Sequence, residues 1–277
     1  MKSAFKIFSV QEQNNDNHLL IEAGCESISF LLFSKSPFAV NGLIIYNLEK
    51  NLLPPELAEE INNCINSESM LRQSFNSCTI CYNFKESMLV PQQYFDAPAQ
   101  SEILDLFFGN SNASIVYCDK LTEQKMLNVY RVEEIIALVL QEFYPGATHI
   151  HASSLQVNKL PEQSNSLSCI VYHNGIKIIL CKENKLQLVQ YFSYNVALDV
   201  AYHLLNVCAQ HNIPTDEVNI LLSGMIDEQS NLYNEIYKYF LNIQFDKPTM
   251  EVALADGILE YPAHFFSHLI SLASCVS

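Results

Sequence analysis

Short apolar runs separated by turn residues mark the start of the first half of the chain. Such runs bounded by Gly or Asn are typical of β-strands, and Gly24 and the Asn41-Gly42 pair lie near the junctions. The predicted strands cover residues 18–23, 27–33 and 40–48. We expect them to form consecutive antiparallel strands.

Helical periodicity follows the three strands. Pro54 and Pro55 favour a helix start, and acidic residues suit its first turns. The apolar positions Leu57, Ile61, Cys64 and Ile65 then recur at the spacing of one helical face. This helix should therefore bury one side.

The rest of the first half mixes both periodicities. Strands are predicted at residues 79–84, 114–118, 127–132 and 148–153, and helices at 100–108 and 133–143. In the second helix the apolar residues expected to face one way are Ile135, Ile136, Val139, Leu140 and Phe143. Pro145-Gly146 should end that helix.

A polar, helix-poor segment at residues 158–166 predicts the domain boundary. Strands are expected after it at 168–172, 176–181 and 186–192, with Asn174-Gly175 and Glu183-Asn184 as the two hairpin turns. A helix at 196–209, capped by Asn195, a strand at 218–222 and a helix carrying Leu232, Ile236, Tyr237 and Phe240 complete the pattern.

Both halves thus share the order of three strands, a helix, a strand and a helix. Three antiparallel strands extended by parallel strands through crossover helices describe a ribonuclease-H-like unit. We predict an α/β protein with tandem ribonuclease-H-like domains, residues 1–157 and 158–277, in an actin-like ATPase arrangement of mixed sheets with helices on both faces.

Charge and composition narrow the partners. The chain has 277 residues, with 15 Lys plus Arg against 30 Asp plus Glu and a formal charge of −15, which opposes binding to nucleic acid. Neither a signal peptide nor a membrane-spanning apolar run is recognisable. Nine cysteines at irregular spacing fit reduced thiols, so we expect a cytoplasmic protein.

Four segments carry a resemblance to a known family: LLIEAGCESISFLLF at 19–33, NVYRVEEIIALVLQEFYPG at 128–146, CIVYHNGIKIILCKENKLQLVQYF at 169–192 and NILLSGM at 219–225. As a set they resemble a bacterial family of unknown function with an actin-like, ribonuclease-H-like fold. The chain is more distantly similar to actin-like pilus-assembly and type II secretion proteins.

The resemblance implies a place for a nucleotide. Actin-like ATPases hold phosphates between two Asp-x-Gly-x-x-Ser/Thr turns, where Asp helps to organise the metal and Gly lets backbone amides approach. Here Glu22 stands at the Asp position, Gly24 at the Gly and Ser27 at the Ser/Thr position, while Glu26 adds negative charge. The first turn is therefore only partly retained.

The other two nucleotide motifs depart further from the pattern. In the second turn Tyr172 or His173 stands where Asp is expected, and the turn closes through Asn174-Gly175. The adenosine motif survives as Ser223-Gly224 followed by Met225, whose side chain replaces the second Gly and crowds the backbone approach. We retain Glu22, Gly24, Ser27, Ser223 and Gly224 as degenerate cofactor-binding positions.

One cysteine pair and one histidine pair are candidate chemical sites. Cys78 and Cys81 have CxxC spacing but lie in a predicted strand, where residues three apart point to opposite faces. His149 and His151 share one strand face but lack nearby further zinc ligands. We expect structural residues in both cases, and no metal site.

Three remaining features also point to structure more than to chemistry. His264 and His268 are four apart on a predicted C-terminal helix, but Phe265 replaces the Glu of a zinc-protease motif. Ser223-Gly224 lacks the preceding Gly of a hydrolase elbow. The aromatic stretch of Tyr233, Tyr237, Tyr239 and Phe240 is expected to face the core, with a protein-binding patch as the alternative.

The leading hypothesis is a non-catalytic, degenerate actin-like protein that binds an unknown protein partner or assembles with itself. The alternative is an ATP-binding or ATP-hydrolysing actin-like or sugar-kinase-like enzyme rebuilt around Glu22, with ATP and Mg²⁺ as cofactors. A third reading is a module that binds another small molecule, although nothing in the sequence names one.

Overall fold

A computed structural model describes residues 3–9, 16–159, 165–248 and 252–277. Contacts divide the chain into two compact units. One runs to Asn158 and includes Val252–Ile258 and Leu272–Ser277; the other comprises Lys159–Glu251 and Leu259–Ser271. The C-terminal part thus contributes to both units. Residues 160–164 of the predicted linker lie outside the described residues, and the assignment of two ribonuclease-H-like domains divided at 157 and 158 stays a prediction.

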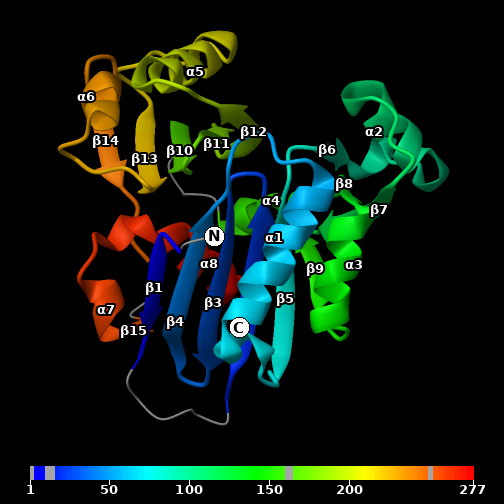
Figure 1. The fold of residues 1–277 in the computed structure, drawn as a ribbon. Helices are drawn as coiled ribbons and strands as arrows, with labels where there is room; N and C mark the ends of the chain where they lie inside the picture. The colour runs from blue at the N-terminus through cyan, green and yellow to red at the C-terminus, as the bar shows by residue number, and fades with distance from the viewer. Residues whose placement is uncertain (1–2, 10–15, 160–164, 249–251) are drawn as a thin grey trace. The chain divides into compact units, whose positions relative to one another are not determined.

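The first unit is built on a mixed β-sheet (Figure 1). Its strands are β1 (Phe5–Phe8), β2 (His18–Gly24), β3 (Ser27–Lys35), β4 (Phe38–Asn47), β5 (Ser77–Asn83), β9 (Thr148–His151) and β15 (Ala253–Leu254). The strand order is β1-β4-β3-β2-β5-β9, and β15 pairs with β4. Strands β2, β3 and β4 are antiparallel, whereas β5 is parallel to β2 and β9 is parallel to β5.

Two helices, α1 (Pro54–Ser67) and α3 (Glu134–Phe143), pack together and against this sheet. Figure 1 shows α1 in front of the strands. Every residue of β2 is buried, as expected for a strand covered on both faces. The start of α1 is fixed by Glu56, whose Oε2 accepts a 2.7 Å hydrogen bond from the backbone amide of Leu53.

A small sheet is inserted between β5 and α3. Its strands β6 (Ser87–Pro91), β8 (Met126–Glu133) and β7 (Ser114–Leu121) lie in the order β6-β8-β7. One helix, α2 (Gln100–Phe108), packs on it around a small core of Val90, Leu104 and Val129. The short helix α4 (Ala152–Gln156) follows β9.

The second unit repeats the topology of the first. Its strands are β10 (Asn165–Val171), β11 (Gly175–Lys182), β12 (Lys185–Ser193), β13 (Asn219–Gly224) and β14 (Asn242–Phe245), in the order β12-β11-β10-β13-β14. The first three are antiparallel, and β13 and β14 extend the sheet in parallel. This order matches β4-β3-β2-β5-β9 strand for strand.

Helices α5 (Ala197–Gln210) and α6 (Asn231–Tyr237) supply apolar residues to the core of the second unit. The chain ends with α7 (Asp256–Leu259), a 3₁₀ turn (Ala263–Phe265) and α8 (Ser267–Cys275). Within the described ranges, no helix has the length and apolar character needed to cross a bilayer. The predicted mixed α/β class is confirmed.

Most predicted elements are present, but four strands were missed. Strand β1 pairs with β4, and the Phe8 ring lies over Gly42, where an added Cβ would come within 2.6 Å of Phe8 Cδ1. Strands β6, β14 and β15 were also unpredicted. All four have five residues or fewer, too few to establish a period.

Several local predictions were wrong. The strand predicted at 148–153 ends at His151, because His151 Nδ1 accepts from the Ser153 amide at 3.2 Å and caps α4. Asn195 does not cap α5; the Asp199 carboxylate accepts from the amides of Asn195 and Val196 instead. Ile135 is exposed, so it does not share the buried face of α3.

Candidate functional site

The first candidate turn lies at the end of β2 in the first unit. Glu22 is 1% exposed, and its Oε1 accepts a hydrogen bond from Asn83 Nδ2 at 3.1 Å. Gly24 pairs with Asn83 in the parallel register of β2 and β5, where an added Cβ would lie 3.0 Å from the Asn83 carbonyl oxygen. Ser27 begins β3 and is buried.

The structure therefore brings Glu22, Gly24 and Ser27 together. Glu22 and Gly24 have structural roles. The acid stands within the sheet beside Asn83, and the glycine permits close approach of β5. Among the residues that the structure describes, no group of three or more His, Cys, Asp or Glu side chains is arranged to hold a metal ion. The residues present do not form the carboxylate-rich set that Mg²⁺ prefers.

The second turn differs from its predicted closure. The Tyr172 amide donates to the Gly175 carbonyl at 2.8 Å, so the two loop residues are His173 and Asn174. Gly175 belongs to β11, and a Cβ there would collide with the Tyr191 hydroxyl. The Tyr194 hydroxyl lies 3.1 Å from the carbonyl oxygen of Tyr172 and 3.3 Å from that of His173. The Tyr194 side chain, from the same unit, therefore donates to the backbone carbonyls of this turn.

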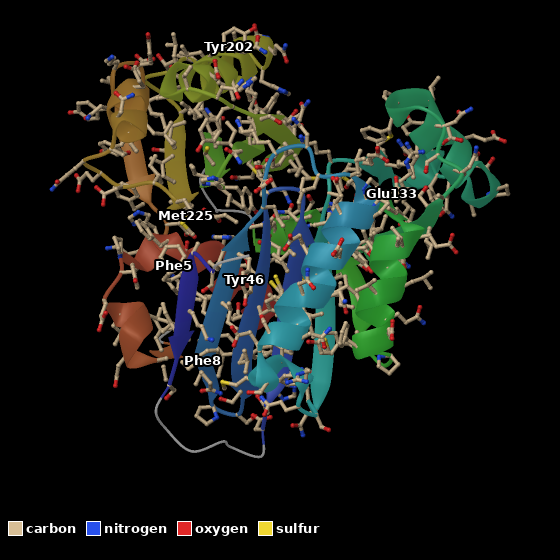
Figure 2. All side chains as sticks on the ribbon, in the orientation of Figure 1. Phe5, Phe8, Tyr46, Glu133, Tyr202 and Met225 are labelled. Carbon is tan, nitrogen blue, oxygen red and sulfur yellow. The ribbon has the colours of Figure 1, made fainter. Side chains whose placement is uncertain are left out.

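The third motif ends β13. Gly224 has φ +82°, and an added Cβ would lie 2.2 Å from the Val171 carbonyl oxygen. That oxygen accepts from the amide of Met225, which Figure 2 labels, at 2.8 Å. Ser223 is buried. The glycine is required by the pairing of β13 with β10 irrespective of any ligand.

The five predicted cofactor-binding positions are thus divided between the two units. Glu22, Gly24 and Ser27 belong to the first, and Ser223 and Gly224 to the second. Their role in nucleotide binding stays a prediction.

Cys78 and Cys81 lie on β5 as expected, at positions that alternate between the faces of the sheet. Burial raises the pKa of the Cys78 thiol to about 12, and Cys81 is buried. A thiol held in its neutral form is a poor nucleophile and a poor metal ligand.

His149 and His151 both lie on β9, and each has a structural partner. His149 stacks on Tyr117 and its Nδ1 lies 2.9 Å from the Tyr82 hydroxyl, while burial lowers its pKa. His151 Nε2 lies 3.1 Å from the Phe84 carbonyl oxygen. The two imidazoles pack between the main and inserted sheets.

A polar network beside these histidines was not predicted. The Ser154 hydroxyl donates to Asp119 Oδ2 at 2.6 Å, and Asn128 Nδ2 donates to the same hydroxyl at 2.9 Å. The His151 amide also donates to Asp119 Oδ2 at 2.8 Å, and burial raises the pKa of this acid. The network connects β7 and β8 to α4. No local spacing predicts it, because Asp119 and Ser154 are far apart in the sequence.

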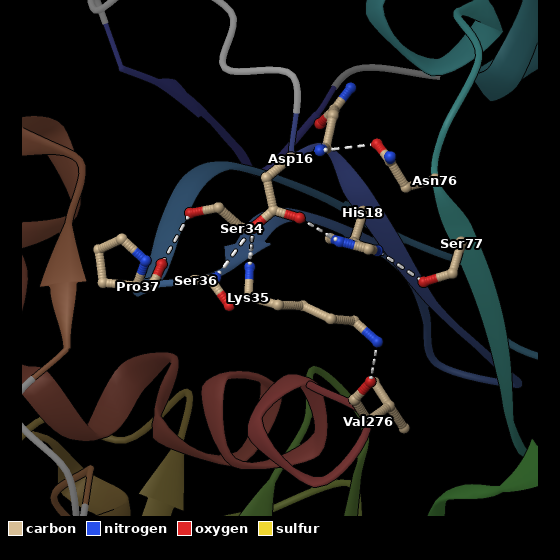
Figure 3. Close-up of polar contacts among 10 residues, drawn as sticks. Asp16, His18, Ser34, Lys35, Ser36, Pro37, Asn76, Ser77 and Val276 are labelled. Atoms are coloured by element: carbon tan, nitrogen blue, oxygen red, sulfur yellow. Dashed lines mark hydrogen bonds and ion pairs between the residues drawn. The ribbon is translucent and has the colours of Figure 1, made fainter.

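A second unpredicted row joins Asp16, His18 and Ser77 (Figure 3). His18 Nε2 lies 2.6 Å from Asp16 Oδ1, and its Nδ1 lies 2.7 Å from Ser77 Oγ. These are the residue types of a hydrolytic triad, but there Nε2 faces the serine and Nδ1 the acid. Asp16 Oδ2 also accepts from the amides of Lys35 and Ser36, so the row ties β2 and β5 to the β3–β4 hairpin.

The two C-terminal histidines do not share one helix, contrary to prediction. His264 lies in the 3₁₀ turn, stacks on Phe245 and has Nε2 2.7 Å from the Ile226 carbonyl oxygen. His268 lies on α8 and contacts Tyr172 edge to face.

The predicted aromatic stretch is only partly in the core. Phe240 is fully buried, but Tyr237 and Tyr239 are exposed, so the expectation that the stretch faces inward was wrong for these two. A separate hollow of about 570 Å³ is lined by Pro91, Gln92, Gln93, Gln124, Lys125 and Met126. Its lining contains one charged residue, Lys125, and no acid.

Comparisons with known proteins agree with this fold. A family model described as "Protein of unknown function (DUF3822)" matches residues 7–243. No curated protein gives a match. A Bacteroides thetaiotaomicron VPI-5482 protein with an actin-like ATPase fold and unknown function is similar, with a TM-score of 0.75, 18% identity and coverage of 93% of this chain and 96% of that one.

Two other solved structures are similar over nearly their whole length. The PilM-PilN type IV pilus biogenesis complex gives a TM-score of 0.65 at 13% identity, covering 94% of this chain and 98% of that one. The cytoplasmic domain of EpsL, from the type II secretion system of Vibrio cholerae, gives 0.51 at 9% identity, covering 94% of each chain. The predicted actin-like fold and family resemblance are confirmed.

Proposed function

This chain belongs to the DUF3822 family of proteins of unknown function, and we propose that it is a non-catalytic actin-like protein that binds a partner protein or assembles with copies of itself. The observation that carries this proposal is the burial of Glu22. A metal-organising acid must present its oxygens to the metal and its waters, whereas Glu22 lies inside the sheet beside Asn83.

The retained glycines do not require a nucleotide. Gly24 makes room for the Asn83 carbonyl and Gly224 for the Val171 carbonyl. The close packing at both positions requires glycine whether or not the protein binds a nucleotide. The enzyme alternative therefore loses its strongest sequence support.

Exposed apolar side chains support a binding role. On α5, Leu198 and Tyr202 lie one turn apart and are both exposed; Tyr202 is labelled in Figure 2. Near the end of α6, Tyr237 and Leu241 are also exposed. Tyr is enriched at protein interfaces, and the buried centre of an interface contains few charged residues.

The structural relatives motivate the same reading. The PilM-PilN structure is a complex, and EpsL is a component of a secretion system. By analogy with these relatives, we propose that the ligand of this chain is a protein. The proposal includes tandem ribonuclease-H-like domains at 1–157 and 158–277 and a cytoplasmic location.

Calorimetric titration with ATP and Mg²⁺, together with a phosphate-release assay, tests the lack of catalysis. We expect no binding heat, no phosphate above the blank and no rise in melting temperature, because a ligand that binds only the folded state raises apparent stability. Micromolar binding with turnover would contradict the proposal. If Glu22→Ala then abolished turnover while the exposed-site control Glu59→Ala did not, the enzyme rebuilt around Glu22 would replace it.

A further inference from the structure

Helix α2 has two apolar sides, only one of which is buried. Leu104 is fully buried in the core of the inserted sheet. Leu106, two residues on, lies about 200° around the helix from it and is 80% exposed, and Phe107 is 65% exposed. With the half-buried Ile103 these residues form an i, i+3, i+4 stripe, which we call the α2 outer face.

Such a stripe is unusual on a surface helix, whose outer side is normally polar. Apolar side chains at i, i+3 and i+4 are the pattern by which one helix packs on another. Because the stripe lies on the convex surface of a helix and is a little more than one turn long, a helix lying alongside α2 covers it better than a small molecule would. The geometry therefore favours a helical occupant.

The α2 outer face is held in place from behind. Arg131 on β8 is buried and donates from Nη1 to Asp105 Oδ1 and from Nη2 to the Gly109 carbonyl oxygen, each at 2.7 Å. Its Nε donates to Glu86. The guanidinium thus fixes both a side chain of α2 and the backbone just beyond its end. Because α2 is already ordered, binding of a partner here costs little conformational entropy of the helix.

Charge around the stripe selects the partner. Residues 92–113 contain no Lys or Arg; their acids are Asp96, Glu102 and Asp105, of which Asp105 is paired with Arg131. Exposed Glu102 lies one turn before Leu106. A second copy of the chain would bring the same acids and a formal charge of −15, and an anionic membrane would repel them. The complementary surface is apolar and bordered by Lys or Arg.

From these observations we propose that the α2 outer face docks a basic amphipathic helix of a partner protein. This inference rests on the proposed binding function and names its site and the chemistry of its ligand. The partner's apolar stripe covers Ile103, Leu106 and Phe107, and its Lys or Arg side chains lie beside Glu102.

The test measures, by fluorescence anisotropy, the binding of a labelled 18-residue Leu/Lys amphipathic helix to the full chain. Two further probes are a scrambled peptide of the same composition and a Leu/Glu helix. Wild-type protein should bind the Leu/Lys helix about tenfold more tightly than either. Equal binding of the scrambled peptide would overturn the proposal, since it would show attraction to net charge alone.

The variant that tests the site is Leu106→Ser with Phe107→Ser, and its matched control is Leu138→Ser, an exposed apolar residue of α3 in the same unit. The double variant should weaken Leu/Lys binding at least about tenfold and the control less than about twofold. Glu102→Lys gives a second readout and should weaken binding about threefold. Unchanged binding in the double variant, or the same loss in the control, would show that the site is wrong.

Other occupants give distinct results. Binding to neutral phosphatidylcholine vesicles that the double variant abolishes would replace the helix by a lipid surface. A concentration-dependent dimer that the double variant abolishes would replace it by a second copy. Discovery of ATP turnover would overturn the proposed function while leaving a positive α2 result intact, so the two failures are distinguishable.

Discussion

The side-chain amide of Asn83 on β5 donates a hydrogen bond to Oε1 of Glu22 on β2 at 3.1 Å, inside the first unit. Neighbouring strands therefore meet through polar side chains at the place where the sequence resembles a phosphate turn. A buried carboxylate needs donors within the protein, and Asn83 supplies one of them.

Asn83→Ala should lower the free energy of unfolding of the first unit by roughly 1–3 kcal/mol, because it removes a donor to a buried carboxylate. Chemical denaturation measures this loss. Asn66→Ala is the matched control, since Asn66 Nδ2 bonds to Asn62 Oδ1 on an exposed surface and its loss should change little. Equal effects of the two substitutions would show that the Glu22 contact contributes no special stability.

Gly224→Ala should destabilise the second unit by more than about 3 kcal/mol, because it adds backbone strain at positive φ and a Cβ 2.2 Å from the Val171 oxygen. Gly109→Ala separates the two causes. Gly109 also has positive φ, +83°, but an added Cβ there meets nothing within 4 Å, so only the strain of about 1–3 kcal/mol remains. Thermal unfolding of both variants tests the order, and a milder effect at Gly224 would contradict the packing argument.

Arg131→Met should lower stability by about 2 kcal/mol, because it removes charged hydrogen bonds that are partly screened at Asp105 and Glu86. Amide hydrogen exchange should accelerate in residues 100–109 while exchange in α1 stays unchanged. Lys238→Met, which breaks an exposed pair with Glu235, should change stability by less than about 0.5 kcal/mol. Unchanged exchange in α2 would mean that Arg131 does not hold the helix.

His268 should make the second unit sensitive to acid. Burial lowers its pKa to about 3 from an ordinary 6.5, with a smaller contribution from Lys177. A histidine buried in its neutral form stabilises the fold above pH 6.5. This stability is lost as the pH falls from about 6.5 toward 3, by up to about 1.4 kcal/mol per pH unit.

Denaturation of His268→Gln at pH 7 and pH 5 tests this dependence. The variant should lose less stability than the wild type over that interval, because the imidazole no longer takes up a proton on unfolding. His173→Gln, at an exposed position of the second turn, should keep the wild-type dependence. A slope in His268→Gln equal to that of the wild type would locate the acid sensitivity elsewhere.

Local periodicity was sufficient for most elements of this fold. The apolar runs of β2, β3 and β11 lie between turn residues, which predicts strands, and the stripe of α1 shows a helical period. The Glu183-Asn184 turn has positive φ at both residues, as a hairpin requires. The repeated order of elements also indicated the repeated sheet topology. Short strands such as β1 and β14 could not be predicted, because four residues contain no complete pattern.

The sequence by itself determined the identity of the altered motif residues: Glu22, the Tyr172-His173 turn and Met225 after Gly224 are visible in the chain. Only the tertiary structure decided what these residues do. Glu22 is buried beside Asn83, Tyr194 reaches the carbonyls of the second turn, and Gly224 admits Val171. Each partner lies more than 20 residues away in the sequence, and such contacts depend on which strands become neighbours.

The same distinction holds for α2. Its helical pattern and its acids are local, so residues 100–108 were predicted as they stand in the structure. Which of its apolar residues are buried was decided by the inserted sheet, whose small core accommodates Leu104 and leaves Leu106 and Phe107 exposed. A helix with apolar residues on two sides does not by itself specify which side is covered, because burial depends on the surfaces that the rest of the chain brings to it.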